Sequence, residues 1–325
     1  MEHIKGKLYL MLAFSLAGTS VITGYILSAK LGSFTITAVG LGIMLVCLLP
    51  FYAKKAVRTI RLLKRSDWIM LIMQAVFGIF LFRTFLLFGI GLTSTVEAGF
   101  LTGTTPAITS ILAFFILREK PTGWATLGIA CTVSGILLLQ GVHLHSFELS
   151  VRHIGGNVLI LCAAASESAF NIISRKHRTA DRANADIQIH PIVQTLLVSA
   201  MALVLSIIPA FMERPFSALH MIGLTEWLAL IWYGLIVTAL AFVFFYAGVK
   251  RCDAYTTAAF SGMIPLTSML LSLLLLRESI SWAQWAGGFL IILSMLLIGR
   301  NSKASKDEKT PTSISTRRQS LLKED

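Results

Sequence analysis

The stretch that decides the fold reads GTTPAITSILAFFILREKPTGWATLG over residues 103–128. At a constant offset of 159 positions, its pattern returns as GMIPLTSMLLSLLLLRESISWAQWAG over residues 262–287. Each copy has a proline inside an apolar run, an Arg-Glu pair where that run ends, and a glycine in the next apolar run. A repeat with a fixed period is typical of an architecture built from similar units. Because this offset is about half of the 325 residues, the sequence predicts two related halves.

The composition indicates a membrane protein. The chain is 55% hydrophobic and 14% charged, with a mean hydropathy of +0.77, whereas soluble domains average about 25% charged residues. A transmembrane helix needs about 20 mainly apolar residues. Ten runs meet this length, at residues 8–29, 31–53, 68–90, 98–117, 121–142, 154–174, 191–212, 227–249, 254–276 and 279–299. We therefore expect an all-α integral membrane protein with ten transmembrane helices.

The basic residues predict the orientation, because cytoplasmic loops are enriched in Lys and Arg. With the N-terminus inside, 23 of the 28 Lys and Arg residues fall in cytoplasmic segments and 4 fall in outer loops. The remaining one, Arg83, lies within the third helix. We therefore expect a multi-pass protein of the cell membrane with both termini in the cytoplasm. Since five helices per half is an odd number, the second half enters the bilayer upside down, with Glu119 inside and Glu278 outside.

The chain thus divides into a first repeat at residues 1–142, an inverted second repeat at 143–300, and a tail at 301–325. The tail is polar, rich in Ser, Thr, Lys and Glu, and has no apolar period, which predicts a disordered cytoplasmic segment. Inverted repeats recur in secondary transporters, where the substrate binds near the bilayer midplane between the halves. Some channels and membrane enzymes share this symmetry, so it favours transport without establishing it.

Pro106 and Pro265 occupy matching places in the two halves. A proline inside a helix removes one backbone donor and frees a carbonyl one turn earlier, which in lipid must find a partner or water in a cavity. Together with Gly103 and Gly262, these residues are candidate helix breaks and hinges beside a cavity. A packing kink that neighbouring helices satisfy is an equally weighted alternative.

Arg83 and Glu97 are charges inside apolar helices. An Arg at the centre of a membrane helix costs about 2.5–3.5 kcal/mol on insertion scales, so it is expected to face protein or water and to have a partner. Both residues lie about 10 Å below the outer surface, on either side of the apex between helices 3 and 4. We therefore predict an Arg83–Glu97 pair, in which Arg83 meets an anionic group of the substrate and Glu97 is its counter-ion or a proton site. The alternative is an ion pair that only ties the two helices together.

Glu167 lies about 20 Å deep in helix 6, among small residues that allow close helix approach. It is a candidate site for a coupled proton or for the substrate, with Asn171 nearby. A purely structural glutamate, hydrogen-bonded to Ser166, to Asn171 or to neighbouring backbone, is the alternative. Tyr233 and Tyr246 are candidates for an aromatic pocket, although the aromatic residues of such a helix more often face lipid or pack against other helices.

The pattern resembles the drug/metabolite transporter superfamily, in its EamA-domain branch. The resemblance rests on the blocks at residues 106–119 and 265–278 and on the following Gly128 and Gly287. It implies a ten-helix bundle around a central cavity and the movement of small metabolites such as amino acids and amines, often outward. Family members often have a Ser-Trp-Ala sequence in helix 6, where this chain has Glu167 between two serines, so no relative's substrate transfers to it.

The function expected from these features is secondary transport, more an export than an import, of a small polar and amino-acid-like metabolite. The expected mechanism is alternating access, driven by a gradient of H⁺, another ion or a substrate. No nucleotide-binding or hydrolase motif is present, and the histidines lack the spacing of a metal site. We therefore expect no enzyme activity, cofactor, metal or nucleic-acid partner. A channel, a scaffold and a membrane enzyme are the alternatives, and a homodimer is left open.

Overall fold

Helices make up the part of the chain that the computed structural model describes, which is residues 2–117, 123–144, 151–183, 189–252, 257, 260–277 and 281–308. A helix satisfies its own backbone hydrogen bonds, as a segment in lipid must. Within the described residues, seven helical stretches are long and apolar enough to cross a membrane: Ile4–Ser28, Ser33–Ile60, Arg65–Ile90, Thr95–Ile116, Val151–Ser174, Pro191–Met212 and Leu224–Val249. Three shorter apolar stretches accompany them, at Thr126–Gly135, Met263–Leu276 and Trp285–Ser294. The fold is that of a multi-pass membrane protein.

The first half of the chain contains eight helical elements within the described ranges. They are α1 (Glu2–Ser28), α2 (Ser33–Ile60), α3 (Arg65–Ala75), the π-helix η1 (Val76–Leu81), α4 (Phe82–Ile90), α5 (Thr95–Thr102), α6 (Thr105–Leu117) and α7 (Gly123–Leu144). The elements α3, η1 and α4 follow one another without interruption, so together they form one long helix with a π-helical middle.

The second half of the chain has the same character. Its described elements are α8 (Val151–Ala183), α9 (Pro191–Met212), α10 (Pro215–His220), α11 (Leu224–Ile231), the π-helix η2 (Trp232–Leu240), α12 (Ala241–Val249), α14 (Met263–Leu271), the π-helix η3 (Ser272–Leu276) and α15 (Trp282–Glu308). The last helix, α15, continues to Glu308, so the tail starts as a helix where disorder was expected. Residues 309–325 lie outside the described part.

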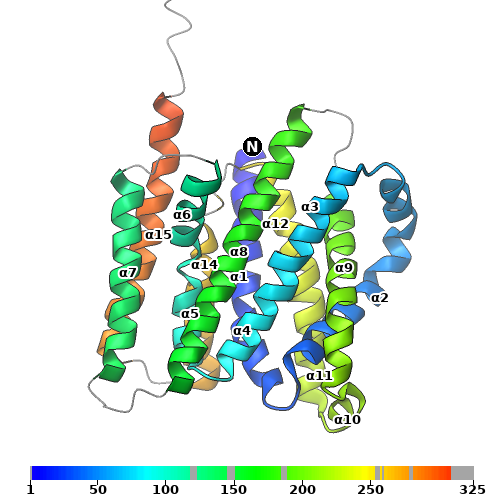
Figure 1. Ribbon diagram of the computed structural model, residues 1–325, viewed down its shortest axis with the longest axis horizontal. Coiled ribbons are helices and arrows are strands. Elements are labelled where there is room, and N and C mark those ends of the chain that lie inside the picture. Colours follow the sequence, from blue (N-terminus) through cyan, green and yellow to red (C-terminus); the bar gives the residue numbers. More distant parts are fainter. Residues whose placement is uncertain are drawn as a thin grey trace, which may run out of the picture.

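The helices stand roughly parallel and antiparallel to one another in one bundle (Figure 1). Helices α7 and α15 pack together at one end of the molecule, and α2 and α9 pack together at the other end. Helix α1 contacts α12 and α14, and α8 contacts α4 and α6, so α1 and α8 occupy the middle. Helix α1 begins and α15 ends on the same side of the bundle.

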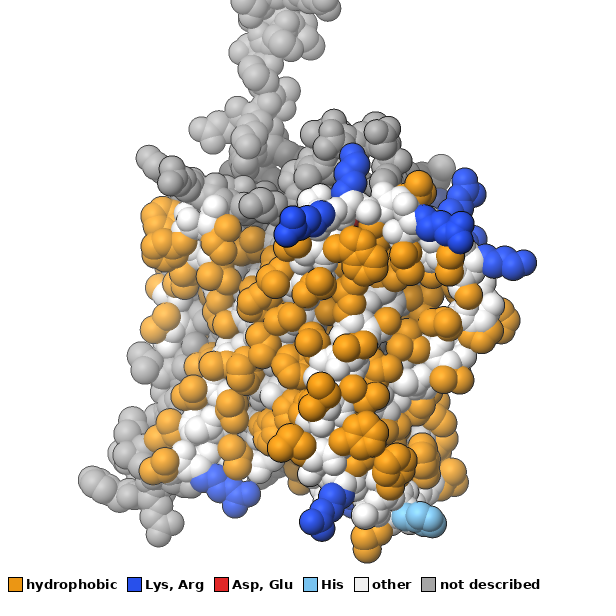
Figure 2. Space-filling model, turned by 45° about the vertical axis from the view of Figure 1, so that its right-hand side comes forward, with side chains coloured by type: hydrophobic (Ala, Val, Ile, Leu, Met, Phe, Trp, Pro, Cys, Tyr) orange, Lys and Arg blue, Asp and Glu red, His pale blue; other side chains and the backbone are white. Residues whose placement is uncertain are grey.

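The outer surface has the distribution that a bilayer requires. On the face shown in Figure 2, hydrophobic side chains cover the middle of the bundle, whereas Lys and Arg side chains gather at its two ends. Large exposed side chains of this kind include Val46 on α2 and Phe115 on α6, which are 75% and 71% exposed. Hydrocarbon is the natural solvent for such side chains.

Helix boundaries recur at the offset of 159 positions that the sequence shows. The matching starts are Arg65 of α3 with Leu224 of α11 and Gly123 of α7 with Trp282 of α15, and the matching ends are Leu81 of η1 with Leu240 of η2. Helices α7 and α15 run in opposite directions in Figure 1, and so do α2 and α9. The π-helical segments η1 and η2 therefore end at equivalent places in the two halves.

The apolar core lies between the central helices. One cluster joins α1, α8, α12 and α14 through Phe14, Phe170, Phe245 and Ile264, all of which are buried. Its aromatic rings pack against one another, with 5.2 Å between the ring centroids of Phe170 and Phe245. These four residues also line a cavity, which contains Glu167 and Asn171.

Candidate functional site

A cavity of about 60 Å³ lies at the centre of the bundle. Its lining comes from α1, η1, α4, α8, α12 and α14 and comprises Ala13, Phe14, Ala17, Gly78, Phe82, Glu167, Phe170, Asn171, Ala241, Phe242, Phe245 and Ile264. A water needs roughly 10–15 Å³ of such volume, so the space holds a few waters or a small chemical group. Glu167 and Asn171 are the two polar side chains in this lining.

Glu167 projects from α8 into this apolar surrounding and is 9% exposed. The hydroxyl of Thr105, on α6, lies 3.1 Å from Glu167 Oε2 and is its hydrogen-bond partner. The same hydroxyl donates to the carbonyl oxygen of Thr102 at 2.8 Å, so a single proton lies between two oxygen atoms. The small residues around Glu167 let α8 approach α6 closely enough for this contact.

Thr105 begins α6 just after a break in the helix. Helix α5 ends at Thr102, and Gly103 and Thr104 form a turn before α6. Pro106 is the second residue of α6, where a missing backbone donor is tolerated. The carbonyl of Thr102, which loses the N–H of residue 106 as a partner, accepts from the hydroxyl of Thr105. The hydroxyl of Thr104 donates to the carbonyl of Leu101, and that of Ser168, on α8, donates to the carbonyl of Thr105. The break thus brings a polar stretch of backbone close to Glu167.

The second half has a corresponding interruption at Gly262, directly before α14. Pro265 is the third residue of α14, and the hydroxyl of Ser268 donates to its carbonyl at 3.1 Å. Helix α1 crosses here at close range, because a Cβ on Gly18 would lie 2.7 Å from the carbonyl oxygen of Ile264. Gly103, Pro106, Gly262 and Pro265 therefore all lie at interruptions, and their role as hinges stays a prediction.

Asn171 lies one helical turn beyond Glu167 on α8 and lines the same cavity. Its Oδ1 is buried and has no hydrogen-bond partner in the described part of the chain. Tyr246 is also buried, but its hydroxyl donates to Gln74 Oε1 at 3.1 Å, and Gln194 Nε2 donates to the same oxygen at 3.1 Å. Tyr246 therefore ties α3, α9 and α12 together, and the aromatic lining comes from the neighbouring Phe242 and Phe245 instead.

Arg83 is 3% exposed on α4 and contacts η2. Its Nη2 donates to the hydroxyl of Thr238, and its Cζ lies 4.4 Å from the centre of the Tyr233 ring. A cation above an aromatic face is attracted by the ring quadrupole. The Thr238 hydroxyl in turn donates to the carbonyl oxygen of Tyr233 at 2.7 Å, a contact across five residues that the π-helix permits. Arg83 Nη1 and the Tyr233 hydroxyl are buried without a partner in the described residues.

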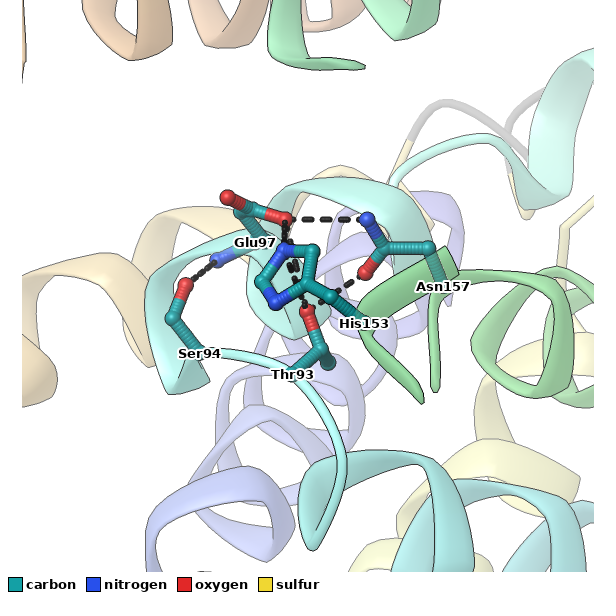
Figure 3. Close-up of polar contacts among 5 residues, drawn as sticks. All are labelled: Thr93, Ser94, Glu97, His153 and Asn157. Atoms are coloured by element: carbon teal, nitrogen blue, oxygen red, sulfur yellow. Dashed lines mark hydrogen bonds and ion pairs between the residues drawn. The ribbon is translucent and has the colours of Figure 1, made fainter. Parts of the chain in front are cut away.

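Glu97 lies in a different cluster (Figure 3). It is 1% exposed, and its Oε2 lies 2.8 Å from His153 Nε2 and accepts a hydrogen bond from Asn157 Nδ2 at 2.9 Å. The hydroxyl of Thr93 completes the group at 3.3 Å, and Ser94 caps α5 by accepting from the backbone N–H of Glu97. His153 and Asn157 come from the first turns of α8, so the cluster joins α8 to the start of α5.

The predicted Arg83–Glu97 pair is therefore wrong. The depth of the two residues was estimated along one helical hairpin, which says nothing about the direction in which each side chain points. Arg83 turns towards η2, whereas Glu97 turns towards α8. Sequence reasoning missed His153 and Asn157 as partners. Their spacing of four residues at the start of a helix, at the depth of Glu97, was the available signal.

Comparison with known proteins gives one consistent result. The sequence matches the EamA-like transporter family over residues 4–140 and 154–300. It is 28% identical over 281 residues to the uncharacterized transporter YetK of Bacillus subtilis (strain 168), covering 85% of this chain and 81% of that protein. An uncharacterized transporter of Clostridium kluyveri is 23% identical over 325 residues, covering 96% and 98% of the two chains. A crystal structure is similar in fold, with a TM-score of 0.63 and 19% sequence identity. The match covers 92% of this chain and 98% of the chain in that structure.

Proposed function

Since the chain belongs to the EamA-like transporter family, we propose that it is a secondary transporter which moves a small polar metabolite through the central cavity by alternating access. The observation that carries this proposal is the burial of Glu167 in the cavity wall, against the interruption between α5 and α6. Broken helices that bring backbone and a polar side chain to the middle of a bundle are the usual form of a transporter site.

The proposed architecture has ten spans in two inverted units, residues 1–142 and 143–300. Three findings support it: the family match falls in two stretches, the helix boundaries recur at one offset, and matching helices run in opposite directions. Both termini are proposed to be cytoplasmic, which the excess of Lys and Arg in the corresponding loops supports. Export is the proposed direction, with the lipid bilayer and the metabolite as partners.

Glu167 is the proposed site of the coupled proton. Its Thr105 neighbour has one hydroxyl proton for two oxygen atoms, and the carbonyl of Thr102 lies closer than Glu167 does. A protonated Glu167 donates to the Thr105 oxygen and satisfies all three groups, whereas an ionised Glu167 competes for the hydroxyl proton. Gain and loss of a proton at Glu167 therefore change how α8 is held against the break between α5 and α6. In this way the proton gradient is coupled to movement of these helices.

The test uses proteoliposomes and a substrate found by screening amino acids and amines for toxicity or uptake in cells with and without the protein. Glu167→Gln keeps the shape and the hydrogen bond to Thr105 but cannot exchange a proton. We expect it to lose proton-driven accumulation about tenfold or more, while exchange of substrate across the membrane persists. The matched control is Glu226→Gln, because Glu226 pairs with Lys30 at 2.6 Å away from the cavity.

Unchanged proton-driven accumulation in Glu167→Gln would remove Glu167 from the mechanism. The channel alternative is separated by counterflow, in which an excess of unlabelled substrate on one side draws labelled substrate against its gradient. A carrier shows saturable counterflow because its site faces one side at a time, whereas a channel shows none. Flux without saturation or counterflow would therefore contradict the proposed transporter.

A further inference from the structure

Arg83 corresponds, in the internal repeat, to a residue of the second half that lines the cavity. At the offset of 159, Phe82 corresponds to Ala241 and Arg83 corresponds to Phe242. Phe82, Ala241 and Phe242 all line the cavity. The backbone of Arg83 thus adjoins the lining, while its guanidinium contacts Thr238 and Tyr233 on η2, the element that leads directly into Ala241.

The guanidinium of Arg83 is buried, and no carboxylate among the described residues pairs with it. Its contacts are a hydroxyl and an aromatic ring, and both Arg83 Nη1 and the Tyr233 hydroxyl have no hydrogen-bond partner there. Burying an ion without an opposite charge is costly, above all within hydrocarbon. Two unused donors beside one buried positive charge form the recognition chemistry for an anionic group, and a guanidinium suits a planar carboxylate best.

The π-helical backbone is a separate observation that points to the same place. Arg83 is the second residue after η1 and Tyr233 lies within η2, and these two segments end at equivalent positions of the two halves. Short π-helical segments are rare and occur often at functional sites, because the extra residue per turn redirects side chains. Here Tyr233 lies in such a segment, and its ring centre lies 4.4 Å from Cζ of Arg83.

We propose that Arg83 and Tyr233 bind the carboxylate of the transported metabolite. The inference rests on the proposed transport function and adds the class of substrate. Glu167 and the rings of Phe14, Phe170 and Phe245 line the cavity that the backbone of Arg83 adjoins, so they supply a negative charge and an apolar surface near it. An amino acid with an apolar side chain carries all three matching groups. Its carboxylate pairs with Arg83, its amine lies near Glu167, and its side chain packs on the rings.

The variants separate this role from a structural one. Arg83→Gln removes the charge and keeps a polar side chain, and Tyr233→Phe removes only the hydroxyl, which has no partner here, and keeps the ring. If Arg83 binds an anion, Arg83→Gln folds at least as stably as the wild type, because it no longer buries an uncompensated charge. The matched control is Arg251→Gln, since Arg251 lies over the Tyr9 ring at 5.3 Å but is exposed.

The experiment measures thermal unfolding of the purified full-length protein in detergent with a panel of probes. Each apolar amino acid is compared with the amine that lacks its carboxylate and with the acid that lacks its amine, for example L-leucine, 3-methylbutylamine and 4-methylpentanoate. We expect an amino acid and its acid to stabilise the wild type and Arg251→Gln. Arg83→Gln is expected to bind them about tenfold or more weakly, and Tyr233→Phe to show a smaller loss.

Three results would overturn the inference: stabilisation by amines alone, carboxylate affinity that persists in Arg83→Gln, or no response to any carboxylate. Counterflow in proteoliposomes then distinguishes a failure of the carboxylate site from a failure of the proposed transport function. Saturable counterflow of an amine, undiminished in Arg83→Gln, leaves the transporter standing and removes the carboxylate site. A wild type without counterflow of any compound in the panel removes both.

Discussion

Glu97 shows how a single carboxylate is held within an apolar bundle. Three side chains, His153, Asn157 and Thr93, surround its Oε2, so the negative charge is shared among several donors. It also lies in the first turn of α5, where the backbone N–H groups and the helix dipole favour a negative charge. The cluster therefore fixes the start of α5 to the start of α8 and stabilises the bundle at that end.

Asn157→Leu tests this cluster, because Asn157 donates to Glu97 and accepts a hydrogen bond from the hydroxyl of Thr93. The substitution removes a donor at 2.9 Å from a carboxylate that is 1% exposed, and a buried group left with a lost partner costs about 1–3 kcal/mol. We expect a lower midpoint of thermal unfolding for the purified variant in detergent. The control is Val158→Leu, at the adjacent position, which is 52% exposed. Equal midpoints for Asn157→Leu and the control would contradict the stabilising role of the cluster.

Among single residues, the sequence identified the buried charges but not their partners. Arg83, Glu97 and Glu167 stand out because an ionisable side chain within an apolar run is visible in the sequence itself. Their partners depend on the direction in which each helix turns its faces, which depth alone does not determine. Thr105 and Thr238 were missed for the same reason, since a threonine in a membrane helix usually satisfies itself on its own backbone.

At the scale of helices, glycines decide how closely two elements approach. Helix α2 crosses η2 at Gly40 and Gly234, and a Cβ added to Gly234 overlaps the carbonyl oxygen of Gly40. Small residues let membrane helices pack backbone against backbone. This crossing also holds η2, and therefore Tyr233, at a fixed distance from α2, because Tyr233 adjoins Gly234.

Gly234→Ala tests the crossing. The overlapping group is backbone and cannot rotate away, so α2 and η2 must separate, and we expect a loss of stability of about 1–3 kcal/mol. Gly42→Ala is the matched control on α2, because its added Cβ meets nothing within 4 Å. It is expected to be neutral or stabilising by up to about 1 kcal/mol, since alanine favours a helix over glycine. The free energies are compared by unfolding the purified variants, and similar losses in both would refute the close crossing.

The prolines predicted where the helices are interrupted, but not the form of the interruption. A proline alone indicates a kink in the turn before its own position. The structure instead ends α5 before Gly103 and starts a new helix, with Pro106 in its first turn. The π-helical segments η1 and η2 had no signal in the sequence, because no residue type favours them strongly and packing against neighbouring helices determines where they form.

At the scale of the whole molecule, the repeat carried most of the prediction. The membrane class and the two halves follow from composition and from one offset, and the structure adds which helices are neighbours. The pairs α2 with α9 and α7 with α15 each combine matching helices of the two halves. Contacts between distant parts of a chain depend on how side-chain faces fit together, so one sequence without structural information does not determine them.

The last prediction concerns the inverted arrangement of the two halves. Arg58, near the end of α2, and Ser217, on α10 after α9, correspond at the offset of 159, and both are exposed. We expect Arg58→Cys to react with a membrane-impermeant maleimide only after the cells are permeabilised, and Ser217→Cys to react in intact cells. Each is made in a variant without the four native cysteines, and Lys5→Cys and Lys30→Cys serve as an inner and an outer reference. Reaction of both positions from the same side would contradict the inverted arrangement and, with it, a substrate cavity that opens alternately to the two sides.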